Sequence, residues 1–263
     1  MNLDPAHALD LTARLAAAAA LLSNCEALAA SGRMFAYPGV FHISGVQSMH
    51  WRRSPLLAVL GGRETQLLVL GLLGSLTGVL LGPWNPLGYL ALLTALAVRL
   101  AMGQRRILGS DGAEQLTTLV LLSVALAGFP PFSAARTALA VGFIAAQLVL
   151  CYTTSGVSKL ASPVWRGGAA VGDIIGTQTY GLHLAARALG RVPFGSPGLG
   201  WAVMLFEAAF AAALFGPPWV VLSALGAALL FHLGCAVVMG LNDFLWAFPA
   251  TYPCVLVSSQ WLR

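Results

Sequence analysis

The sequence predicts an all-α fold, a polytopic bundle of transmembrane helices that forms one domain over residues 1–263 without a soluble part. Apolar residues make up 58% of the chain and charged residues 9%, whereas a soluble domain usually carries about 25% charged residues. Apolar stretches of about 20 residues, the length that crosses a bilayer, recur along the chain. A protein so poor in charge cannot cover a water-facing surface, and lipid removes that requirement.

Seven apolar stretches are long enough to be spans. Pro83 and Pro86 separate the second from the third, and Pro130-Pro131 ends the fourth, because proline breaks a helix. The first stretch is rich in alanine but is the least secure span, since three charged residues interrupt it. The predicted spans are residues 9–30, 65–81, 87–102, 116–132, 137–160, 198–215 and 219–239.

Two further segments fit a membrane less simply. Residues 161–197 are too polar to cross lipid freely and predict a re-entrant or interfacial helical segment packed on protein. Residues 244–258 are apolar but short and hold two prolines, which predicts a half-span and gives seven to eight spans in all.

The net charge of +5 comes from scattered arginines in short loops, so we expect no nucleic-acid partner and explain the charge by topology. With seven spans, the loops 31–63 and 103–115, the segment 159–197 and the C-terminus share one side, which collects nearly all Lys and Arg. The positive-inside rule places this side in the cytoplasm and the N-terminus outside. The N-terminus is acidic and predicts no cleaved signal peptide.

No metal site is predicted. The cysteines form no C-x-x-C pair and are best explained as small buried residues. His42 and His50 are eight residues apart in a predicted loop, which is a weak pattern for a metal ligand pair. The chain also lacks a glycine-rich phosphate loop and a G-x-S-x-G nucleophile motif.

Lys159 is the only lysine beside thirteen arginines, and it lies near the end of the fifth apolar stretch. A desolvated lysine can serve as a base near neutral pH, which arginine cannot do, but a lysine at this place can also extend to the membrane surface. Gln147, Cys151, Ser155 and Lys159 recur every four residues, with Tyr152 beside them. Such a polar stripe faces a cavity or hydrogen-bonds a neighbouring helix.

Glu207 and His232 lie in the middle of the sixth and seventh spans. Ionisable groups at that depth are costly and indicate a functional site. The alternative is structural: Glu207 pairs with an arginine or with His232, or a neutral His232 donates to a carbonyl.

Four segments, taken in order, resemble one family. The first is Ser110-Asp111-Gly112 followed by Gln115-Leu116, and the second combines Gln147, Tyr152, the run from Ser155 to Leu160, Trp165 and Gly167-Gly168. The third is Phe206-Glu207, and the fourth joins Phe231-His232 to the run from Gly240 to Phe244, which contains Asn242. Together they resemble the horizontally transferred transmembrane domain (HTTM) family, the membrane core of vitamin K-dependent gamma-carboxylases, over about residues 100–260.

The resemblance implies that Lys159 is the base that deprotonates a vitamin K-type hydroquinone. It implies that His232 lies in or near the quinone pocket with Gln147, Tyr152, Ser155, Trp165, Glu207 and Asn242, and that Asp111 and Gly112 form a structural turn. We therefore expect an integral protein of the bacterial inner membrane that carries out quinol-dependent oxidation or carboxylation, with a peptide as possible substrate.

The main alternative is a non-catalytic membrane subunit or accessory protein that binds a partner protein or helps to mature a peptide. That hypothesis predicts a salt-bridged Lys159, whereas the enzyme hypothesis predicts a cavity lined by Lys159, Tyr152, Gln147, Glu207 and His232. A transporter is less favoured, because the sequence shows neither an inverted repeat nor paired broken helices.

Overall fold

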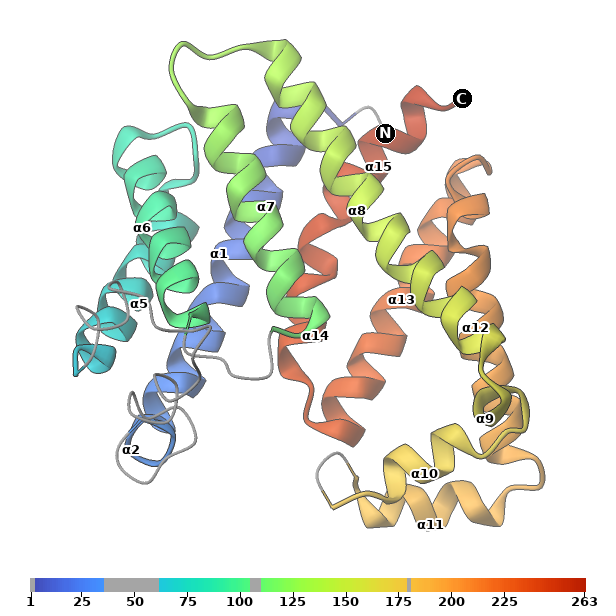
Figure 1. Ribbon diagram of the computed structural model, residues 1–263. Helices are drawn as coiled ribbons and strands as arrows, with labels where there is room; N and C mark the ends of the chain where they lie inside the picture. The colour runs from blue at the N-terminus through green and yellow to red at the C-terminus, as the bar shows by residue number, and fades with distance from the viewer. Residues whose placement is uncertain (1–2, 36–61, 105–109, 179–180) are drawn as a thin grey trace.

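The computed structural model describes residues 3–35, 62–104, 110–178 and 181–263. His42, His50, Arg105 and Arg106, which entered the metal and topology predictions, lie outside these residues. Every regular element of the described chain is a helix, as Figure 1 shows, and the predicted all-α bundle is confirmed. Its elements are α1 (Pro5–Ala29), α2 (Ser31–Met34), α5 (Glu64–Leu81), α6 (Pro86–Gly103), α7 (Gly112–Gly128), α8 (Ala134–Ala161), α9 (Pro163–Arg166), α10 (Ala170–Gly176), α11 (His183–Arg191), α12 (Gly195–Ala213), α13 (Pro218–Met239), α14 (Asn242–Ala247), the 3₁₀ turn η2 (Pro249–Thr251) and α15 (Tyr252–Trp261).

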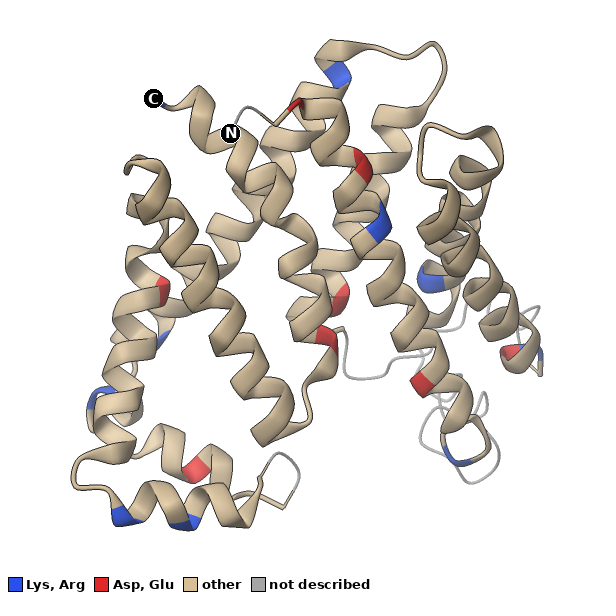
Figure 2. Cartoon of the chain, turned by 180° about the vertical axis from the view of Figure 1, so that it is seen from behind, with Lys and Arg blue, Asp and Glu red and all other residues tan. Residues whose placement is uncertain are grey.

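The protein is an integral membrane protein. Five of the described helices, α5, α6, α8, α12 and α13, are long and apolar enough to cross a bilayer. The helix α7 is apolar but has 17 residues. It begins four residues before the predicted fourth span because the Asp111 side chain caps its first turn by accepting from the Glu114 N–H at 2.8 Å, and it also ends four residues earlier, at Gly128. Figure 2 shows how few charged positions the chain carries.

The helix α1, whose sequence is the least typical of a span, lies at the centre of the bundle. It packs against α5, α7, α8, α14 and α15. Its alanines let these neighbours approach closely, and most of the alanines from Ala8 to Ala20 are fully buried. Its charged residues are satisfied locally, since Arg14 pairs with Asp10 at 2.8 Å and donates to the Val79 and Leu80 carbonyls at the end of α5.

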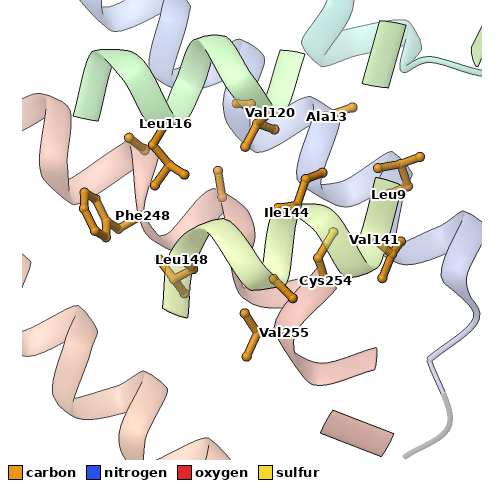
Figure 3. Packing of buried hydrophobic residues seen from close by; sticks show 14 of the residues in the cluster. Leu9, Ala13, Leu116, Val120, Val141, Ile144, Leu148, Phe248, Cys254 and Val255 are labelled. Carbon is orange, nitrogen blue, oxygen red and sulfur yellow. The ribbon is translucent and has the colours of Figure 1, made fainter. Parts of the chain in front are cut away.

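The core lies where α1, α7, α8 and the C-terminal segment meet. Figure 3 shows Leu9 of α1, Val120 of α7 and Ile144 of α8 converging with Val255 of α15. All four side chains are almost completely buried. This packing anchors the first half of α8, so its second half, which carries Lys159, projects from a fixed base.

The second half of α8 packs on α12, whereas α13 packs chiefly against α14 and makes few contacts with α12 (Figure 1). The short helices α9, α10 and α11 connect α8 to α12 at one end of this pair. They correspond to the segment predicted to be re-entrant or interfacial. Their packing is uneven, because α10 buries Ala170 and Val171 whereas α11 buries no residue.

One part of the predicted topology needs correction. The C-terminal stretch was expected to leave Arg263 on the side that carries Lys159 and the arginine-rich loops. Instead α14, η2 and α15 return along α1 and α8, and the two termini lie at the same end of the bundle, opposite α10 and α11 (Figure 1). Arg263 there donates to the carbonyl of Gly216, in the turn between α12 and α13.

Candidate functional site

Lys159 forms an ion pair with Glu207 inside the α8–α12 interface. Its ammonium lies 2.5 Å from the Oε2 atom of Glu207 and donates to the Ser155 hydroxyl, also at 2.5 Å. The lysine side chain is 19% exposed and the glutamate side chain 4%. Ser155 and Lys159 are one helical turn apart on α8, so the predicted polar stripe does present these two residues to a neighbouring helix.

A close crossing of the two helices makes this pair possible. A Cβ atom added to Gly156 would lie 2.8 Å from backbone atoms of Glu207 and Ala208. Gly156 is therefore the contact point at which the backbones of α8 and α12 approach each other. Because Glu207 is part of that contact, its carboxylate is held within reach of Lys159 on the next turn of α8.

Trp165 completes the surroundings of the ammonium. Pro163 begins the short helix α9 two residues after α8 ends, and this turn brings Trp165 back over the end of α8. The Lys159 Nζ atom lies 5.2 Å from the centroid of the indole ring. A cation over an aromatic face at this distance is stabilised by the ring quadrupole, typically by about 0.5–1 kcal/mol or more when water is excluded.

A second polar pair lies deeper along α8. The Tyr152 hydroxyl and the Nε2 atom of His232 are 2.7 Å apart and join α8 to α13. Both residues are almost completely buried. Seven residues separate Tyr152 from Lys159, about 10 Å along the helix axis, so the two pairs lie on neighbouring levels of the same face of α8.

An aromatic shell surrounds Tyr152 and His232. The Tyr152 ring lies 4.3 Å from one phenylalanine ring of α12, and the His232 ring lies 4.2 Å from Phe248 at the end of α14, measured between centroids. This shell excludes water, so it strengthens every polar interaction inside it. Its phenylalanines are Phe206, Phe210, Phe231, Phe244 and Phe248.

One buried polar atom inside this shell, the Nδ1 atom of His232, has no hydrogen-bond partner among the described residues. A buried polar atom left unpaired costs about 1–3 kcal/mol, so most such atoms in proteins have a partner. The Nδ1 atom is therefore a place where a bound group with a hydrogen-bonding oxygen would be stabilised.

The structure does not gather all the predicted site residues. Gln147 is half-buried on α8, three turns and about 18 Å along the helix from Lys159. Asn242 is exposed at the start of α14 and donates to Glu26 of α1 at 3.0 Å. Asp111 and Gly112 begin α7, and Asp111 caps that helix as a structural turn residue should.

Other features of the site were not expected from the sequence. The structural alternative expected Glu207 to pair with an arginine or with His232, but its partner is Lys159. Gly156 was quoted only as part of a motif, although it determines the helix crossing. The phenylalanine shell had a recognisable signal, since Phe206 and Phe210, and likewise Phe244 and Phe248, are four residues apart.

Among the described residues, no group of three or more His, Cys, Asp or Glu side chains is placed to hold a metal ion. No family model, no curated protein and no solved structure matches this chain. The site therefore has to be interpreted from its own geometry.

Proposed function

We propose that the protein is a membrane enzyme that uses Lys159 as a base toward a hydroquinone, in quinol-dependent oxidation or carboxylation like that of the gamma-carboxylase membrane core. The observation that carries the proposal is the Lys159–Glu207 pair, which places a proton donor and a proton acceptor 2.5 Å apart at the edge of a buried aromatic shell. Structural ties between membrane helices seldom need a full charge of each sign, because buried charges are costly.

The pair can prepare Lys159 for proton transfer. With both groups charged, the ammonium has no free electron pair and cannot act as a base. If the ammonium passes one proton to Oε2 of Glu207, both groups become neutral, and this state buries no charge in the low-dielectric interior. The Nζ atom can then accept a proton from a hydroxyl brought next to it, while Ser155 and Trp165 hold it in position.

The residues nearby fit a quinone head group. The phenylalanine shell offers flat apolar surfaces, and the unpaired Nδ1 atom of His232 offers a hydrogen bond to one oxygen of the ring. When bound, a hydroquinone supplies a weakly acidic hydroxyl and two reducing electrons. The role of the chain is to orient the ring, exclude water from it and hold the proton at Nζ.

A turnover assay tests the proposal. The protein in nanodiscs is supplied with a naphthohydroquinone and oxygen, and the oxidation rate is corrected for empty nanodiscs. We expect Lys159→Arg to lower the rate by about 100-fold or more, since arginine keeps the positive charge but cannot act as a base. The control is Ser158→Ala, a change of an exposed residue on the same turn. Full activity of the arginine variant would contradict the base role.

The alternative is a non-catalytic subunit that binds a partner membrane protein, and two observations favour it. Lys159 is salt-bridged, as that hypothesis predicts, and α13 leaves many apolar side chains exposed, among them Trp219, Leu230 and Val237. In this case Lys159→Arg, which keeps the charge, should be tolerated. A fixed second protein should then co-purify with the wild-type chain in mild detergent.

A further inference from the structure

The helix α11 presents arginines and apolar side chains together on an unpacked surface. Arg187 and Arg191 lie one turn apart on one face and are exposed, and none of the residues of α11 is buried. Beside them, Leu184 is 66% exposed and Phe194, just after the helix, is 84% exposed. Neither arginine has an ion-pair partner within the part of the chain that the structure describes.

The position of α11 along the chain restricts what can lie against this surface. It ends at Arg191, and α12, one of the apolar helices long enough to span the membrane, begins at Gly195. Three residues cannot carry the chain far, so α11 is held at the level where α12 enters the membrane. The packing of α10 and α11 on the start of α12 holds it there as well.

The charge around α11 is predominantly positive, with Asp173 on the adjoining helix α10 as the nearby carboxylate. No Asp or Glu lies between Asp173 and Glu207 in the sequence, and Arg166, Arg187 and Arg191 share this end of the bundle. Exposed Leu and Phe side chains beside the arginines are unfavourable in water but favourable among acyl chains just below the head groups. A surface that is basic and apolar at the head-group level matches an anionic lipid in both respects.

We propose that α11 binds the head groups of anionic phospholipids, with Arg187 and Arg191 contacting the phosphates and Leu184 and Phe194 inserted among the acyl chains. An acidic protein surface would satisfy the arginines but would leave Phe194 without an apolar environment. The proposal does not depend on the reaction at Lys159, because it rests only on the surface and the position of α11.

Lipid titration of the purified full-length protein tests this, with binding followed by native mass spectrometry. An arginine near an anionic surface contributes about fivefold in affinity, so the preference of the wild type for phosphatidylglycerol over phosphatidylcholine should fall by at least about tenfold in R187Q/R191Q. The matched control is R136Q/R263Q, which removes two charges at the opposite end of the bundle and should change the preference less than twofold.

Two results would overturn the proposal: an unchanged lipid preference in R187Q/R191Q, or an equal loss in the control variant. A further arm of the lipid titration adds free glycerophosphoglycerol, which is the head group without acyl chains. It should not displace the lipid at millimolar concentration, and displacement would show that α11 binds a soluble phosphate rather than a membrane lipid. Circular dichroism of each variant verifies that the helix content is unchanged.

Discussion

Replacing Lys159 with methionine is expected to lower the free energy of unfolding by about 3–5 kcal/mol. The change leaves the Glu207 carboxylate, whose side chain is 4% exposed, without its cation inside the bundle. Burying an unpaired charge is among the most costly changes a protein can undergo, and the surrounding lipid offers no water to solvate it. Reversible unfolding in mixed detergent micelles, followed by circular dichroism, gives the difference.

The double variant K159M/E207M separates a charge effect from a packing effect. Methionine fills a similar volume at both positions, and replacing both members of a buried ion pair by apolar residues is often neutral or stabilising. We expect the double variant to recover most of the stability that K159M loses, while still being inactive in the hydroquinone assay. If the double variant is as unstable as K159M, the loss comes from packing and the ion pair is not the cause.

Substituting Gly156 by alanine is expected to lower the free energy of unfolding by about 1–3 kcal/mol, the usual cost of overpacking a close contact. The added methyl group would meet the backbone of α12 at Ala208, and backbone cannot move aside as the end of a side chain can. The helices must therefore separate, which also lengthens the distance between Lys159 and Glu207. The same unfolding measurement applies, together with the hydroquinone oxidation rate, which should fall as well.

The matched control is Gly226→Ala on α13. An added Cβ there meets no atom within 4 Å. Alanine favours helix over glycine by about 1 kcal/mol, so this variant should be as stable as the wild type or more so. If Gly156→Ala behaves like Gly226→Ala, the crossing of α8 and α12 is looser than the structure indicates.

The all-α membrane bundle could be predicted from composition and the apolar stretches, because lipid forces the backbone into helices wherever the side chains are apolar for about 20 residues. The path of the C-terminal segment along α1 and α8 could not. Pro163, which begins α9 directly after α8, and Asp111, which caps α7, determine helix ends by local chemistry that is visible in the sequence. The central position of α1 was harder to predict, because Arg14 pairs with Asp10 on its own helix but also donates to the Val79 and Leu80 carbonyls of α5, far away in the sequence.

The sequence was enough to predict which residues form the site, but not which of them contact one another. Lys159, Glu207 and His232 were each recognisable because an ionisable group is costly at membrane depth. Their pairing depends on the rotation and crossing of α8 against α12 and α13, and Gly156 sets one crossing through backbone contact alone. A glycine in a glycine-rich membrane protein carries no signal that distinguishes a crossing point from the 28 other glycines.

The central claim, that Lys159 exchanges a proton with a bound hydroquinone, can be tested at the atom concerned. Because Lys159 is the only lysine, ¹⁵N-lysine labelling with a lysine-free tag gives a single Nζ resonance, recorded for the protein in nanodiscs without oxygen. The claim predicts that this resonance shifts saturably as a naphthohydroquinone is added. The dimethyl ether of that compound, which has no acidic hydroxyl, should leave the resonance in place. An Nζ resonance that stays unchanged up to high hydroquinone content in the bilayer would contradict the claim and leave the ion pair as a structural tie between α8 and α12.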